Sequence, residues 1–274
     1  MITRYIIMTL MKDREELQKL ADKGDFRSLI EAMGHAQPYI RFAASDLLAS
    51  QGERVLPLLI EALSSDNPDI RKGAARALGV IGDRRAVQPL LERLDKDLQG
   101  VGQFIIDALA DIGDPEVIPN LCNATRSHSL SIRYSAVRAL GKLGDPRATP
   151  FLIEALSDSA SIVRLRAVES LSHMGEPSLW APISEMLKDQ SAGVRAVAAR
   201  VLGEMGSARA VDYLLPLLKS DVESDVTEAA KALGYLGSSK AVRPLMDAKA
   251  NEGRERVLQA ITAALEAIEK AAEE

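Results

Sequence analysis

The chain has 274 residues and only ten aromatic side chains, five Tyr, four Phe and one Trp. Alanine and leucine contribute 39 and 36 residues, and both residue types favour closely packed helices. This composition excludes a thick globular core built on bulky rings and favours an all-helical chain of many thin layers. The net charge of −5, from 34 basic and 39 acidic residues, excludes a bulk attraction to nucleic acid or to an anionic membrane.

The cysteine count and the N-terminal residues indicate a cellular location. Cys122 is the single cysteine, so an intrachain disulfide and a thiolate metal cluster are excluded, as is typical of a reducing compartment. The first eleven residues are rather apolar, but they contain Arg4 and are too short to cross a bilayer. We therefore expect a cytoplasmic protein with no membrane partner.

A pattern of three markers repeats along nearly the whole chain. Leucines that close an apolar stretch recur about every 31 residues, at Leu48, Leu78, Leu109, Leu140, Leu171, Leu202, Leu233 and Leu265. A glycine follows four residues later in seven copies, at Gly52, Gly82, Gly113, Gly144, Gly175, Gly206 and Gly237. An arginine stands seven residues earlier in five copies, at Arg41, Arg71, Arg133, Arg164 and Arg195. Markers that stay in register indicate an internal structural repeat.

Each repeat is predicted to contain two helices. In residues 69–81 the apolar side chains follow helical spacing and line one face. Gly82 is expected to end this helix in a left-handed conformation, and Asp83 to cap the next one. The second helix runs through residues 86–94, where Pro89 is expected to bend it. A proline recurs near this place at Pro57, Pro119, Pro150, Pro182 and Pro244.

The third repeat departs from the pattern. Gly102 takes the place of the recurring arginine, and Gly100 precedes it. Two glycines at the start of a helix weaken that helix because glycine loses more backbone entropy than other residues. Either this helix begins late, at about Gly102, or the segment is a hinge.

Written out through one copy, the repeat reads Ile-Arg-x-x-Ala-x-x-Ala-Leu-Gly-x-Ile-Gly-Asp-x-x-Ala-Val-x-Pro-Leu-Leu-x-x-Leu. From about Asp25 to Lys270, this pattern resembles the short HEAT-like repeat of the phycobilisome-lyase type. The resemblance implies an all-α fold, a right-handed α-solenoid of about eight helical hairpins whose arginine-bearing helices line the concave side. It also implies that the recurring arginine and the Asp of the Gly-Asp turn are structural residues.

The resemblance also implies a domain organisation. We expect one domain over residues 1–274, with repeats over 25–252. Because a stack of repeats needs polar ends, residues 12–23 are predicted to form an N-terminal cap helix and residues 254–274 a C-terminal cap helix.

The common motifs of enzymatic chemistry are missing from the sequence. It contains no P-loop, no dinucleotide-binding glycine pattern, no Gly-x-Ser-x-Gly elbow and no His-Glu-x-x-His motif. Deoxyhypusine hydroxylase, a HEAT-like enzyme, holds iron on paired His-Glu steps, but His35, His128 and His173 are not followed by glutamate here. We expect no metal and no cofactor. HEAT-like DNA glycosylases need a basic concave surface, which the charge balance disfavours.

One position on the arginine-bearing helix alternates in charge. The residues two before the closing leucine are Asp46, Arg76, Asp107, Arg138, Glu169, Arg200 and Lys231, of which the first six alternate in sign. Stacked repeats would place these side chains next to one another. We interpret them as a ladder of ion pairs between repeats, each contributing at most about 1 kcal/mol when exposed. A polar surface for a mixed-charge partner is the alternative.

A partner surface is predicted on the same helices. Four of the ten aromatic side chains fall on the inferred concave face, and aromatics beside arginines are typical interface anchors. The candidate partner-binding residues are Tyr39, Phe42, Phe104, Asp107, Tyr134, Arg138, Leu165, Arg166, Glu169 and His173. Phe104, Tyr134 and Leu165 are expected at the centre. Alternatively, the rings pack between adjacent helices as ordinary core.

These observations favour a non-catalytic scaffold or adaptor, a monomer that binds a protein or peptide on the concave side of the solenoid. The alternative is a bilin-lyase-like enzyme, or a chaperone of a chromophore or cofactor attachment step. The lyase alternative follows from the repeat type alone, since no motif of the sequence carries lyase chemistry.

Overall fold

The computed structural model describes residues 2–96 and 100–273, with side chains over 13–94, 96 and 100–273. Every regular element among these residues is helical. The chain divides into two compact units, which we call unit 1 (residues 1–143) and unit 2 (residues 144–274). The all-α solenoid fold predicted from the repeat is confirmed. The single domain over 1–274 stays a prediction.

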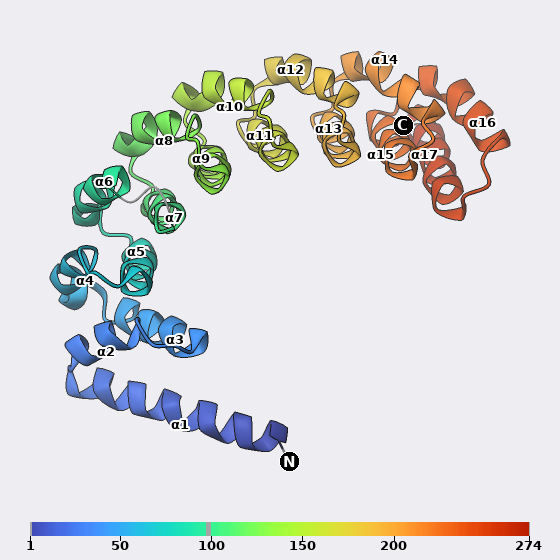
Figure 1. Cartoon of the computed structure of the whole chain (residues 1–274). Helices are drawn as coiled ribbons and strands as arrows, with labels where there is room; N and C mark the ends of the chain where they lie inside the picture. Colours follow the sequence, from blue (N-terminus) through green and yellow to red (C-terminus); the bar gives the residue numbers. More distant parts are fainter. Residues whose placement is uncertain (1, 97–99, 274) are drawn as a thin grey trace. The chain divides into compact units, whose positions relative to one another are not determined.

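Unit 1 is built from hairpins in two layers. Its helices are α1 (Ile2–Lys23), α2 (Phe26–Ala32), α3 (Pro38–Ala49), α4 (Leu56–Ala62), α5 (Pro68–Ile81), α6 (Val87–Lys96), α7 (Gly102–Ile112), α8 (Ile118–Ala124) and α9 (Leu130–Leu143). The arginine-bearing layer contains α3, α5, α7 and α9, each packed on the next, and α4, α6 and α8 form the other layer (Figure 1).

Unit 2 repeats the same arrangement. Its helices are α10 (Thr149–Ala155), α11 (Ser161–His173), α12 (Trp180–Glu185), α13 (Ala192–Glu204), α14 (Val211–Leu214), α15 (Glu223–Leu236), α16 (Val242–Ala250) and α17 (Glu255–Glu273). One layer contains α11, α13, α15 and α17, and the other α10, α12, α14 and α16 (Figure 1).

The two end helices differ in how well the sequence predicted them. Helix α1 extends over Ile2–Lys23, well beyond the predicted 12–23, and packs on α2 and α3. Helix α17 over Glu255–Glu273 agrees with the predicted C-terminal helix at 254–274. Helix α7 begins at Gly102, as the first of the two alternatives for the third repeat predicted. The hinge stays a prediction.

Glycine and aspartate form the turn inside three of the hairpins, as the sequence predicted for Gly82 and Asp83. Gly82 ends α5 with a φ of 72°, and Gly113 ends α7 with a φ of 74°, left-handed values that glycine adopts without steric penalty. The Asp83 carboxylate then accepts a hydrogen bond from the backbone N–H of Arg85 at 2.9 Å. Asp114 and Asp145 cap the equivalent turns of the next repeats.

The recurring prolines do not bend a helix, contrary to the sequence-based expectation. A short 3-10 helical turn, such as Arg84–Ala86, follows each capping residue, and the α-helix starts after it. Pro89 is therefore in the first turn of α6, where no intrahelical acceptor exists for a backbone N–H. Pro57, Pro119 and Pro150 are likewise at the first turn of their helices.

Close contacts between repeats explain the Ala-Leu-Gly signature. A Cβ atom added at Gly79 would lie 2.8 Å from the Ala108 Cα of the next repeat. The same contact recurs in unit 2, where a Cβ at Gly203 would lie 2.7 Å from the Ala232 Cα. The glycine after the closing leucine thus faces the alanine before the closing leucine of the following repeat. Small residues at both positions let the helices approach closely.

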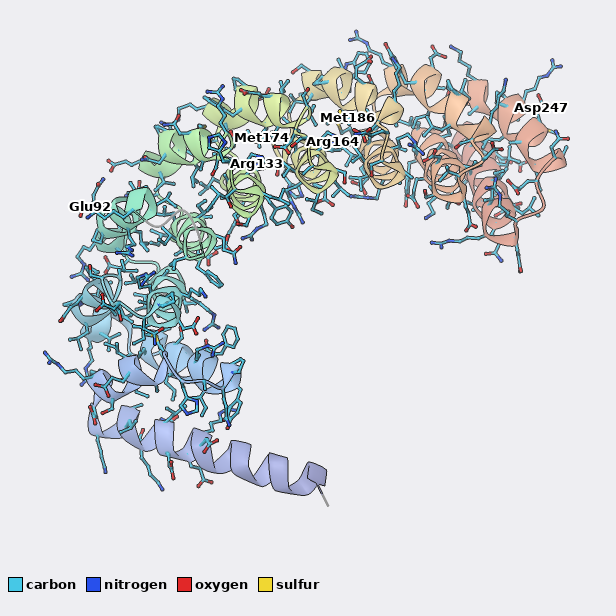
Figure 2. All side chains as sticks on the ribbon, viewed as in Figure 1. Glu92, Arg133, Arg164, Met174, Met186 and Asp247 are labelled. Atoms are coloured by element: carbon cyan, nitrogen blue, oxygen red, sulfur yellow. The ribbon has the colours of Figure 1, made fainter. Side chains whose placement is uncertain are left out.

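The recurring arginines clamp the loop that enters their own helix. Arg133 Nη1 donates to the carbonyl oxygens of Ser127 and His128, at 3.0 and 3.2 Å. Arg164 makes the same pair of bonds to Asp158 and Ser159, at 2.8 and 3.2 Å; both arginines are labelled in Figure 2. Arg41, Arg71 and Arg195 repeat this geometry. These contacts assign the recurring arginine a structural role.

Candidate functional site

A small cavity of about 150 Å³ lies on the arginine-bearing layer of unit 1, between α3, α5 and α7. We call it the ring pocket because the side chains of Phe42 and Phe104 form part of its wall. Its lining residues are Arg41, Phe42, Ser45, Asp69, Lys72, Gly73, Arg76 and Phe104. The sequence predicted Phe42 and Phe104 as partner-binding residues, and the structure brings them to one cavity.

A cation lies next to each of the two rings of this pocket. The Arg76 guanidinium carbon lies 5.4 Å from the centre of the Phe42 ring. Lys72 Nζ lies 6.0 Å from the centre of the Phe104 ring. Both distances are within the range of cation–π attraction, so each ring holds a positive group beside the opening. Phe42 is 53% exposed, which makes it one of the most exposed large apolar side chains that the structure describes.

Two aspartates balance part of this charge. Lys72 Nζ lies 3.0 Å from Asp69 Oδ1, and Arg41 Nη1 lies 3.8 Å from Asp69 Oδ2. The Lys72 ammonium lowers the pKa of the Asp69 carboxyl below its usual value, mainly by hydrogen bonding. Arg76 Nη2 donates to Asp46 Oδ1 at 2.6 Å. The pocket is therefore surrounded by ion pairs within α5 and between α3 and α5.

A second cavity, of about 560 Å³, adjoins the ring pocket on the other side of Phe42. We call it the α1–α3 groove; it is lined by Arg14, Leu17, Tyr39, Phe42, Ala43, Asp46, Leu47 and Ser50. The Tyr39 hydroxyl donates a hydrogen bond to Asp13 Oδ2. Hydrogen bonding to this carboxylate, with burial and its negative charge, raises the pKa of Tyr39 to about 12. Tyr39 thus fixes α3 to α1 and stays protonated.

The predicted residues on α7 and α9 lie further along the same layer. Phe104 and Tyr134 are half-buried, on α7 and α9, rather than enclosed in the core. Arg138 on α9 donates to Asp107 Oδ1 on α7. Burial raises the pKa of Asp107, an effect that the Arg138 charge opposes.

In unit 2, four predicted residues meet at one cavity of about 530 Å³, which we call the polar pocket. They are Arg166, Glu169, His173 and Arg200. Arg166 Nη1 lies 2.8 Å from Glu169 Oε2, and Arg200 Nη2 lies 3.6 Å from Glu169 Oε1. His173 is exposed, and Leu165 is half-buried on α11. Continuity of the predicted partner surface between Tyr134 and Leu165, which belong to different units, stays a prediction.

The charge-alternating position forms pairs between neighbouring repeats. These pairs are Asp46 with Arg76, Asp107 with Arg138, and Glu169 with Arg200. Among the described residues of unit 1, Arg76 and Asp107 do not pair, since Arg76 stacks on Phe42. Lys231 contacts Glu228 on its own helix at 2.7 Å. The alternating charges therefore form separate ion pairs, each between two neighbouring repeats.

A family model described as HEAT repeats matches residues 26–103, 99–172, 149–230 and 180–266. The chain belongs to the HEAT repeat family. No curated protein matches the sequence. Similar solved structures do exist for this HEAT-repeat protein.

Three of these structures are similar to this chain over most of its length. YibA of Escherichia coli is 20% identical with a TM-score of 0.67, over 94% of this chain and 95% of that chain. The complex of CpcE and CpcF of phycocyanin lyase from Nostoc is 18% identical with a TM-score of 0.50, over 78% and 94%. An engineered protein is 19% identical with a TM-score of 0.51, over 92% and 80%. At these identities the similarity shows the fold alone.

The sequence-based reasoning missed one aromatic cluster of the HEAT-repeat protein. Trp180 is half-buried at the start of α12. Its ring meets the Tyr213 ring edge-on, with centroids 5.8 Å apart, and the Arg209 guanidinium carbon lies 5.8 Å from the Trp180 ring centre. Trp180 and Tyr213 are 33 positions apart in neighbouring repeats. This spacing is close to the repeat period of about 31 residues, which is the signal that could have brought the two rings together.

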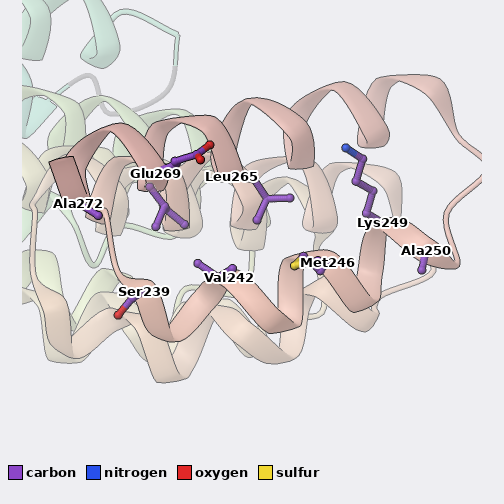
Figure 3. A pocket seen from close by; sticks show the side chains of 9 residues that line it. Ser239, Val242, Met246, Lys249, Ala250, Leu265, Glu269 and Ala272 are labelled. Carbon is purple, nitrogen blue, oxygen red and sulfur yellow. The ribbon is translucent and has the colours of Figure 1, made fainter.

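An apolar groove of about 620 Å³ lies between α16 and α17, in the last hairpin of the HEAT-repeat protein. Val242 and Met246 of α16 lie across it from Leu265 of α17 (Figure 3), and Glu269 is also part of its lining. Met246 is 59% exposed. The groove is the apolar side of the final hairpin, on which no further repeat is stacked in the described chain.

The described residues contain neither a membrane-spanning helix nor a metal-binding cluster. None of the described helices is long and apolar enough to cross a membrane. Within the described part of the chain, no three His, Cys, Asp or Glu side chains gather at a point where they would bind a metal ion.

Proposed function

We propose that this chain is a non-catalytic scaffold that binds a protein or peptide on the exposed side of its arginine-bearing helices. The exposure of Phe42 carries the proposal. A phenyl ring that is 53% exposed to water between two cavities is stabilised by a partner that covers it. The half-buried rings of Phe104 and Tyr134 on the next helices of the same layer support the same surface.

The local charge of the surface also favours a protein partner over nucleic acid. The cations of the ring pocket are interspersed with Asp46 and Asp69, and the chain as a whole carries a net charge of −5. A phosphate backbone needs an extended positive surface, whereas mixed charges around exposed rings are typical of protein recognition.

The proposal includes a cytoplasmic monomer. A chain with one cysteine cannot use intrachain disulfides, as expected for a protein of a reducing compartment. The molar mass in solution, measured by light scattering after gel filtration, is expected to equal 29.6 kDa. A mass of twice this value would contradict the monomer.

Affinity capture tests the binding function. The immobilised full chain is expected to retain a stoichiometric partner from cell lysate, and Phe42→Ser is expected to lose it. Tyr213→Ser on α14 is the matched control, because Tyr213 is also exposed, at 38%, but belongs to the other helical layer. Equal retention by wild type and Phe42→Ser would overturn the proposed surface.

A bilin-lyase-like activity is the competing function, and it predicts a different result. Incubation of the chain with a linear tetrapyrrole and an acceptor protein would then give a covalent coloured adduct, detected after denaturing electrophoresis. A scaffold gives no such adduct.

A further inference from the structure

We propose that the ring pocket binds an acidic side chain, Asp or Glu, of the bound protein or peptide. This inference rests on the proposed function and names the chemistry that one part of the surface recognises. The charges of the pocket, one buried hydrogen-bond donor without an acceptor and the size of the cavity all favour such a side chain.

The ring pocket is positive although the protein is acidic. Three cations line it, Arg41, Lys72 and Arg76, against one lining carboxylate, Asp69. Asp46, which pairs with Arg76, lowers the excess but does not remove it. A cationic side chain would meet this excess charge at short range, where repulsion is strongest. The electrostatics therefore select an anion.

Most donors in the pocket already have acceptors. Arg41 Nη1 donates to the carbonyl oxygens of His35 and Ala36, at 2.8 and 3.0 Å. Lys72 Nζ donates to Asp69 at 3.0 Å. The Ser45 hydroxyl donates to the Gly73 carbonyl oxygen at 2.9 Å. These groups build the pocket, and their bonds hold its walls in place.

Arg76 is the exception. Its Nη2 donates to Asp46 at 2.6 Å, but its Nη1 is buried and has no hydrogen-bond acceptor among the described residues. A buried donor of a charged group without an acceptor is destabilising. An incoming carboxylate would accept this bond, and a charge-assisted hydrogen bond is stronger than a neutral one. An apolar side chain would leave Nη1 without an acceptor.

The size and the walls of the cavity restrict the ligand further. A volume of about 150 Å³ is well below that of a typical small-molecule site, and it suits a single side chain. The rings of Phe42 and Phe104 form an apolar part of its wall, and an ion pair is stronger next to an apolar wall than in bulk water. Asp69 lies in the lining as well, so a single negative charge fits better than a double one.

Selection from a random peptide library displayed on phage tests the inference, with the immobilised full chain as bait. We expect the retained peptides to share an Asp or Glu at one fixed position. Replacing that residue by Asn or Gln in a synthetic peptide is expected to weaken binding by about tenfold, measured by calorimetry, because a charge-assisted bond is lost.

A variant of Arg76 tests whether the ring pocket is the site that distinguishes the acidic peptide from its amide analogue. Arg76→Met is expected to bind the acidic peptide and its amide analogue with equal affinity. Lys142→Met is the matched control, because it also removes one cation from an ion pair between repeats, Lys142 with Asp111, outside the pocket. This control is expected to keep the tenfold preference. If Arg76→Met does not fold, as judged by circular dichroism, Arg76→Gln replaces it.

The outcomes separate the two proposals. Retained peptides without a fixed acidic position overturn the inference and leave the proposed function standing. If Arg76→Met prefers the acidic peptide over its amide analogue as strongly as the wild-type chain does, the inference is also overturned and the proposed function stands. If the wild-type chain retains no peptide, the proposed function fails and the inference fails with it.

Discussion

Arg164 and Asp189 form a two-pronged ion pair between neighbouring repeats of unit 2. Arg164 Nε donates to Asp189 Oδ2 at 2.7 Å, and Nη2 donates to Oδ1 at 2.8 Å. The side chains are only 7% and 6% exposed. Since Arg164 Nη1 also clamps the loop before α11, one guanidinium connects the loops that precede α11 and α13.

Removal of the Asp189 carboxylate is predicted to be strongly destabilising. Asp189→Ala leaves the Arg164 charge buried without a partner, and we expect a loss of about 3–5 kcal/mol in the free energy of unfolding. Urea denaturation measures this loss. The control is Asp212→Ala, which breaks the exposed pair with Lys240 and is expected to lose less than about 1 kcal/mol. Equal losses in the two variants would contradict a special role of the buried pair.

The same pair predicts how stability depends on pH. Hydrogen bonds from Arg164 lower the pKa of the Asp189 carboxyl below its usual value, and the Ser191 N–H adds to this effect. The stabilisation is therefore complete above the unfolded-state pKa of about 3.9 and is lost as the pH falls through the folded-state pKa. Asp83, whose pKa is about 2 because of Arg85, follows the same rule.

We expect the unfolding free energy of wild type to fall as the pH is lowered below about 4. Asp189→Ala is expected to lose less over this range, because it has one carboxylate fewer to protonate. Urea denaturation at a series of pH values compares the two slopes. Parallel curves would show that Asp189 has the same pKa in the folded and unfolded chains.

The sequence predicted the repeat and its turns because they depend on local rules. Gly82 must end its helix since only glycine adopts the left-handed conformation freely, and Asp83 must accept from a nearby backbone N–H. Such constraints act within a few residues and recur with each repeat. The register of hairpins therefore follows from spacing alone.

The contacts that depend on side-chain rotamers and on neighbouring repeats could not be predicted. Phe42 and Arg76 were placed on one face by their spacing, but spacing does not show that the guanidinium stacks on the ring or that Nη1 has no acceptor. Pro89 was expected to bend a helix because the preceding 3-10 turn has no separate sequence signal.

The close approach between repeats predicts opposite effects for two glycines of helix α13. Gly203→Ala places a Cβ 2.7 Å from the Ala232 backbone, so the two helices must separate, and we expect a loss of about 1–3 kcal/mol. Gly193 is exposed in the first turn, and an added Cβ meets no atom closer than 3.7 Å. Gly193→Ala is therefore expected to stabilise by up to about 1 kcal/mol. Thermal unfolding of both variants tests these two predictions. A Gly203→Ala variant that is more stable than wild type would contradict the close packing of α13 against Ala232.

The ion pair between Asp107 and Arg138 tests whether the charge-alternating position fixes the register of repeats. Arg138→Glu replaces attraction by repulsion between α7 and α9, beside Asp107 and close to Asp111. Because the two side chains are 39% and 40% exposed, we expect a loss of only about 1 kcal/mol. This loss corresponds to a decrease in Tm of about 2–4 °C.

A second substitution distinguishes this pairing from a general effect of charge. The double variant Asp107→Arg with Arg138→Glu restores opposite charges in reversed order, so its Tm is expected to return most of the way to that of wild type. Recovery alone would also follow from net charge, which the double variant shares with wild type, so Asp107→Arg alone makes the distinction. This variant makes the chain less negative, and a general effect of net charge predicts no loss of stability, whereas loss of the pair with Arg138 predicts a lower Tm. If Asp107→Arg alone is as stable as wild type, and Arg138→Glu leaves Tm unchanged, the ladder has no role in stability. The position is then available to a partner, as the alternative interpretation of the alternating charges predicts.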